Sequence, residues 1–175
     1  MSKEQDKYDD TLEAVAQLAK ESALKHGGHV PTLVVEGRNV SVIAPLLDLP
    51  PTHDARCLLM FAAGAGLRRE GKIGDIKQVF FICEGWLSVA NQNGTFDLPP
   101  SKDPNRVEVL LISRLIIQSH RHDLMVFEMI RDAEDRLCEL RDFEPLGGKS
   151  DTHAASPLLD VFMEGFHVGK SKRPQ

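Results

Sequence analysis

The first helical pattern lies near the start of the chain. Between Asp9 and Lys25, apolar residues recur at intervals of three and four, so they share one face of a helix. This stripe consists of Leu12, Val15, Ala16, Ala19 and Ala23. An aspartate pair precedes the stripe and two glycines follow it, which are typical start and stop signals. The pattern therefore predicts an N-terminal helix over residues 9–25.

Two short apolar runs follow this helix. The runs His29–Glu36 and Val40–Ile43 are rich in valine, and Gly37-Arg38-Asn39 between them is a turn sequence. We therefore expect these segments to form a β-hairpin.

A second helix is predicted after the next proline pair. Thr52 is a suitable N-cap, and the apolar stripe behind it extends to about Glu70. The stripe consists of Ala55, Leu58, Leu59, Ala62 and Leu67. Gly64 and Gly66 each lower the helix propensity by up to about 1 kcal/mol relative to alanine. We expect glycines at such positions to mark close packing against a neighbour.

Four strand patterns come next, over residues 77–90, 107–118, 124–131 and 136–143. The last two flank a four-residue turn, which predicts a second hairpin. Strands and helices do not alternate as in parallel α/β proteins. The order favours an α+β fold with an antiparallel sheet of about five to six strands flanked by two long helices.

The C-terminal part has a different character. Residues 146–175 are predicted to contain a linker, a short amphipathic helix that begins at Ser156-Pro157, and a basic tail after Gly169. Residues 1–145 are predicted to form a single α+β domain.

Alternate positions in the strands predict which face is buried. In residues 77–90 and 107–118 one set of alternate side chains is apolar throughout, and the other set is mixed. The apolar members of the mixed face are Phe80, Ile82, Trp86, Leu110, Ile112 and Ile116. This face is too apolar for open water, so we expect a buried Trp86 and a homodimer, with the mixed face or the C-terminal helix as the interface.

Composition limits the class of protein. The chain has 175 residues and a formal net charge of −5, which argues against nucleic acid as the partner. The N-terminus lacks a signal-peptide pattern, and no apolar run is long enough for a membrane span. Three widely spaced cysteines, Cys57, Cys83 and Cys138, form neither a disulfide framework nor a zinc cluster, and we expect reduced core thiols. These features favour a cytoplasmic protein.

The leading candidate site combines charged and aromatic residues near two strand ends. Period-2 spacing places Glu84 beside Trp86 on one strand, and Arg106 beside Glu108 on the next. One interpretation is a ligand or catalytic pocket in which Arg106 binds an anion and a carboxylate acts as a base. The other is a partly buried Glu–Arg pair with a structural role.

A second candidate is the segment His120-Arg121-His122-Asp123. Two histidines separated by one residue can share a metal ion, as in JAMM-type zinc hydrolases. The downstream aspartate of that pattern would fall at position 133, which is Ala133, and Glu84 is the candidate upstream glutamate. The two histidines also resemble residues of a turn between strands. The sequence therefore predicts neither a metal site nor a cofactor.

A resemblance covers most of the chain. The residues Glu84-Gly85-Trp86, Pro100-Ser101, Pro104-Asn105-Arg106 and Glu108 resemble a pattern in a family of uncharacterised bacterial proteins. The segments Gly28-His29-Val30-Pro31 and Phe162-Met163-Glu164-Gly165-Phe166 are similar to further motifs of that family. The resemblance implies a bacterial source and no particular activity. The element order also resembles roadblock and profilin-like proteins at the level of the fold alone.

These observations favour a non-enzymatic binding or assembly module that self-associates. The alternative is a small hydrolase or a small-ligand-binding protein that uses Glu84, Arg106 and Glu108.

Overall fold

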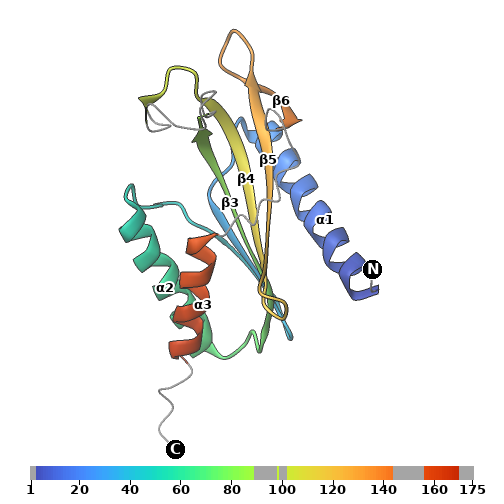
Figure 1. Ribbon diagram of the computed structural model, residues 1–175, viewed down its shortest axis with the longest axis vertical. Helices are drawn as coiled ribbons and strands as arrows, with labels where there is room; N and C mark the ends of the chain where they lie inside the picture. Colours follow the sequence, from blue (N-terminus) through green and yellow to red (C-terminus); the bar gives the residue numbers. More distant parts are fainter. Residues whose placement is uncertain (1–2, 89–97, 99–101, 144–155, 170–175) are drawn as a thin grey trace, which may run out of the picture. The chain divides into compact units, whose positions relative to one another are not determined.

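The computed structural model describes residues 3–88, 98, 102–143 and 156–169 (Figure 1). Within these ranges the helices are α1 (Lys3–His26), α2 (His53–Glu70) and α3 (Pro157–Gly169), and the strands are β1 (Thr32–Gly37), β2 (Ser41–Pro45), β3 (Ile76–Leu87), β4 (Val107–Ile116), β5 (Arg121–Arg131) and β6 (Leu137–Asp142). The strands form one antiparallel sheet in the order β2-β1-β3-β4-β5-β6. The predicted α+β class is confirmed.

Both predicted hairpins are present. Strands β1 and β2 pair with Val34 opposite Ile43, and β5 and β6 pair with Met129 opposite Leu140. Strand β5 begins at Arg121, earlier than the apolar pattern predicts. Its first residues are polar, and Asp123 is held in the strand by an ion pair with Arg114. His122 therefore lies on a strand, and only His120 has the turn position that the sequence predicts for both histidines.

The chain forms two compact units, each built from three segments. Unit 1 comprises Met1–Val30, Ile82–Ile112 and Met125–Asp151, and unit 2 comprises Pro31–Phe81, Ser113–Leu124 and Thr152–Gln175. The predicted linker over residues 145–155 and the tail beyond residue 169 lie outside the described residues. The expected boundary at residue 145 stays a prediction.

Unit 1 contains helix α1, which packs near β6. The buried face of α1 consists of the small residues Ala16, Ala19 and Ala23, all members of the predicted stripe. The ammonium group of Lys20 lies 4.6 Å from the ring centre of Phe127 on β5. The small side chains on this face thus allow α1 to pack closely against the rest of unit 1.

Unit 2 contains α2 and α3, which lie side by side (Figure 1). The Thr52 hydroxyl accepts a hydrogen bond from the Ala55 N–H at 3.3 Å, as expected for an N-cap. At Gly64, an added Cβ would lie 2.9 Å from the backbone nitrogen of Phe166 on α3. The predicted close packing at Gly64 is confirmed. It is wrong for Gly66, where nothing lies within 4 Å.

The mixed face of the central strands is buried in the single chain. Its members Phe80, Ile82, Leu110, Ile112 and Ile116 are each at most 4 % exposed. Trp86 is the exception at 44 % exposed, so the expectation of a buried tryptophan is wrong. The homodimer stays a prediction, but most of the surface from which it was inferred is already covered. Among the free thiols, Cys138 is exposed, so it is not the core residue that the sequence predicts.

Candidate functional site

The four predicted site residues lie in unit 1, and the structure brings two of them into contact. The guanidinium carbon of Arg106 lies 4.3 Å from the ring centre of Trp86. Trp86 is next to the last residue of β3, and Arg106 directly precedes β4, so both side chains project where strands end. An exposed cation–π pair of this kind contributes about 0.5–1 kcal/mol. The result is an exposed aromatic and cationic surface, which we call the Trp86–Arg106 surface.

Glu108 has a different partner from the one that the sequence predicts. Its two carboxylate oxygens accept hydrogen bonds from the Arg131 guanidinium at 2.7 and 2.9 Å. The hydrogen bonds from Arg131 to Glu108 raise the pKa of the arginine, despite the opposing effect of burial. Arg131 also donates to the backbone oxygen of Gly27 at 3.3 Å. Glu108 is therefore one half of a bidentate ion pair that ties β4 to β5.

Glu84 is bound to the segment that follows α1. One carboxylate oxygen accepts a hydrogen bond from the backbone N–H of His29. The same oxygen would lie 2.8 Å from a Cβ at Gly28, so a larger residue there would displace the carboxylate. The hydrogen bond holds the backbone of residues 28 and 29 against β3. Glu84 thus has a structural partner, like Glu108.

His29 is the most unusual titratable group near Glu84. Burial lowers the pKa of its imidazole, while a hydrogen bond with Val30 and the charge of Glu84 act in the opposite direction. Its Nδ1 atom is buried. The neutral form of His29 is therefore favoured. The sequence places His29 in the Gly-His-x-Pro motif, but the motif alone assigns it no role.

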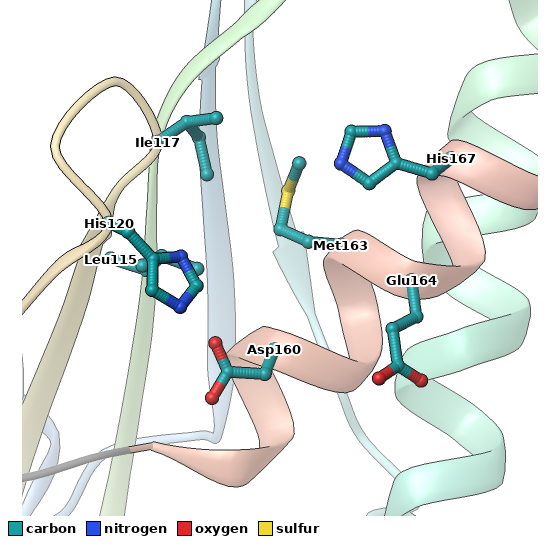
Figure 2. A pocket seen from close by; sticks show the side chains of 7 residues that line it. All are labelled: Leu115, Ile117, His120, Asp160, Met163, Glu164 and His167. Carbon is teal, nitrogen blue, oxygen red and sulfur yellow. The ribbon is translucent and has the colours of Figure 1, made fainter.

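Unit 2 contains a pocket of about 380 Å³ (Figure 2). It is lined by Leu115, Ile117, His120, Asp160, Met163, Glu164 and His167. The last four residues come from α3 at relative positions 0, 3, 4 and 7, which places them on one helix face. Figure 2 shows the carboxylate of Asp160 and the imidazole of His120 on the same side of the pocket. The pocket thus combines an apolar lining with titratable groups.

Three of the side chains at this place offer metal-ligand atoms. The ligand atoms of His120, His122 and Asp160 all lie within 4.8 Å of one another. The Nε2 atom of His122 lies 3.2 Å from Oδ1 of Asp160. The Nδ1 atom of His122 accepts a hydrogen bond from the backbone N–H of Ser156 at 3.3 Å. The H-x-H pair is thus joined to the beginning of α3.

The neighbouring acidic residue, Asp123, is engaged elsewhere. Its Oδ2 lies 2.6 Å from the NH2 group of Arg114, a side chain with no exposed surface, and its Oδ1 lies 2.7 Å from Arg121. Asp123 therefore balances a buried charge.

Asp160 is not identified by the metal-ligand spacing along the chain, because it lies far beyond the position at which a third ligand is expected. The helical spacing of Asp160, Glu164 and His167 was the available signal, since it predicts that three titratable groups share one face. It does not predict that this face meets the H-x-H pair.

Comparisons with protein-family models, with curated proteins and with solved structures gave no match to this chain. The resemblance to a bacterial family therefore stays a prediction. Among the described residues, no helix combines the length and the apolar character that crossing a membrane requires.

Proposed function

We propose that this protein is a non-enzymatic binding or assembly module whose recognition surface centres on Trp86 and Arg106. The observation that carries the proposal is the exposed stack of these two side chains, 4.3 Å apart. Tryptophan and arginine are the residue types most enriched among the energetically dominant residues of protein interfaces. An exposed pair of them has a large area that a partner can cover, and the stack holds the guanidinium in place before binding.

The state of the carboxylates argues against the catalytic alternative. Glu108 uses both of its oxygens to bind Arg131, and Glu84 accepts a hydrogen bond from the backbone of His29. A general base needs a lone pair directed at the substrate. The described contacts of Glu108 leave it poorly placed for that role, and Arg106 lies on Trp86 instead of between the two carboxylates.

We propose a second copy of the chain as the partner, in a bacterial cytoplasm. Arg106 donates its backbone N–H to the carbonyl of Asp103 at 3.3 Å, so an acidic and a basic residue occupy the two ends of one turn beside Trp86. Such a surface is self-complementary under two-fold symmetry, because Arg106 of one copy can face Asp103 of the other. The three free cysteines are compatible with a reducing compartment.

Light scattering of the full chain at micromolar concentrations tests this proposal. We expect a mass of twice 19.4 kDa for the natural chain and 19.4 kDa for Trp86→Ala and Arg106→Gln. Ile43→Ala is the matched control, because Ile43 is 72 % exposed and lies on β2 in unit 2. A natural chain that is monomeric at every concentration would refute self-association. A dimer that persists in both variants would refute the Trp86–Arg106 surface as the interface.

A further inference from the structure

The Oδ1 atom of Asp160 is buried beside the imidazole of His122. A desolvated carboxylate oxygen is costly unless a cation or a hydrogen-bond donor compensates it. His122 is close, with its Nε2 at 3.2 Å, and His120 completes a group of three ligand atoms within 4.8 Å. We propose that His120, His122 and Asp160 bind a divalent transition-metal cation. The site lies in unit 2 and is independent of the Trp86–Arg106 surface in unit 1.

The donor set selects the class of metal. Two imidazole nitrogens and one carboxylate oxygen suit zinc and its first-row neighbours, whereas calcium and magnesium prefer oxygen ligands. Bonds of about 2.0–2.2 Å require the three ligand atoms to move closer together than 4.8 Å. His120 can make this movement because it is exposed in the turn before β5.

The pocket provides the remaining coordination positions. Three protein ligands leave at least one position open on a four-coordinate metal ion. His120 and Asp160 both line the pocket, so a metal ion held between them would border it (Figure 2). A volume of about 380 Å³ lies in the range of pockets that bind small molecules. Glu164 and His167 follow Asp160 on the same lining, where they can contact a molecule bound at the open position.

The hydrogen bond from the Ser156 N–H to Nδ1 of His122 means that metal binding can be detected by a change in the tautomer of His122. Because Nδ1 accepts the Ser156 N–H, the neutral ring carries its proton on Nε2, the nitrogen nearer to Asp160. A metal ion bound through Nε2 takes the place of that proton. The ring proton then moves to Nδ1, and the Ser156 N–H loses its acceptor. Metal binding is thus expected to change the tautomer of His122.

The test is a zinc titration of the full chain after removal of metals with a chelator. We expect one equivalent of zinc to bind in competition with a chromophoric chelator. His120→Ala and Asp160→Asn should each weaken zinc binding by at least about tenfold, the lower range for disturbed metal sites. His26→Ala, an exposed histidine on α1, is the matched control and should bind zinc like the natural chain.

Two further measurements distinguish zinc bound by the imidazoles from zinc bound by the cysteines. Nitrogen NMR should show His122 changing from the Nε2–H to the Nδ1–H tautomer when zinc is added. Cobalt in place of zinc should give a spectrum without thiolate charge-transfer bands, which excludes the three cysteines as ligands. His120→Ala removes an exposed side chain, so it remains informative even where Asp160→Asn unfolds. Failure of zinc to bind, or unchanged affinity in His120→Ala, would overturn the proposal.

Discussion

Substituting alanine for glycine should stabilise the protein at Gly66 and destabilise it at Gly64 and Gly165. Gly64 and Gly66 lie on α2, and Gly165 lies on α3. Alanine is the better helix former by about 1 kcal/mol, so Gly66→Ala should stabilise the protein by up to that amount. Nothing within 4 Å opposes the added methyl group there. At Gly165 an added Cβ would lie 2.8 Å from the carbonyl carbon of Phe61, with the oxygen closer still. At Gly64 it would lie 2.9 Å from the backbone nitrogen of Phe166.

The size of the effect follows from these distances. Ordinary contact begins at 3.4 Å, so Gly165→Ala requires α2 and α3 to separate by at least 3.4 − 2.8 = 0.6 Å. The neighbour is main chain, which cannot rotate away as a side chain could. A gap of about 0.5–1 Å removes a quarter to a half of the dispersion energy of the contacts across it. Overpacking in cores costs about 1–3 kcal/mol, so we expect a net destabilisation of about 2 kcal/mol for Gly165→Ala and Gly64→Ala.

Urea unfolding followed by circular dichroism measures this difference. The control Gly66→Ala and the two test variants should differ by about 3 kcal/mol, which displaces the urea midpoint by about 1 M or more. Midpoints for Gly64→Ala and Gly165→Ala that equal or exceed that of Gly66→Ala would show that the two helices do not approach at the level of the backbone.

Two further predictions concern unit 1. Glu108→Gln should destabilise the protein by about 1–2 kcal/mol, because it weakens the bidentate pair with Arg131, in which the two side chains are 18 % and 24 % exposed. The control Glu139→Gln weakens the exposed pair with Arg141 and should destabilise the protein by less than about 0.5 kcal/mol. Equal urea midpoints for the two variants would contradict this. Because burial lowers the pKa of His29, the unfolded chain binds more protons between that lowered pKa and the usual 6.5. Stability should therefore be complete above pH 6.5 and decline below it. His29→Gln should make the decline shallower while His26→Gln leaves it unchanged, and identical pH profiles for all three chains would exclude this role of His29.

Local patterns predicted the elements of this fold because each was encoded within a few residues. Thr52 and Gly71 mark the ends of α2, and the proline after Ser156 marks the beginning of α3. Period-2 alternation found the strands, and the turn sequences found both hairpins. Strand ends were predicted less well, and the early start of β5 lies where Asp123 pairs with Arg114 on another strand. Tertiary ion pairs of that kind have no local signature.

The candidate site was harder to predict because side-chain partners depend on strand register. The sequence placed Arg106 near Glu108, but the pairing of β4 with β5 instead supplies Arg131 to that carboxylate. The burial of Trp86 was predicted from its alternation with buried neighbours, and the end of β3 breaks that rule. Asp160 was missed for a related reason, since α3 reaches the H-x-H segment only through the tertiary fold.

The interleaving of the two units has a consequence for any attempt to divide this protein. Each unit takes three separate segments, so the chain passes from one unit to the other five times, and β3, β4 and β5 each contribute residues to both. No single cut through the backbone releases either unit intact, and a cut within β3, β4 or β5 divides a strand that contributes to both units. A fragment expressed alone should therefore lack strands that its own strands pair with in the full chain. Two complementary fragments produced together contain all the segments that both units need, so they can reassemble.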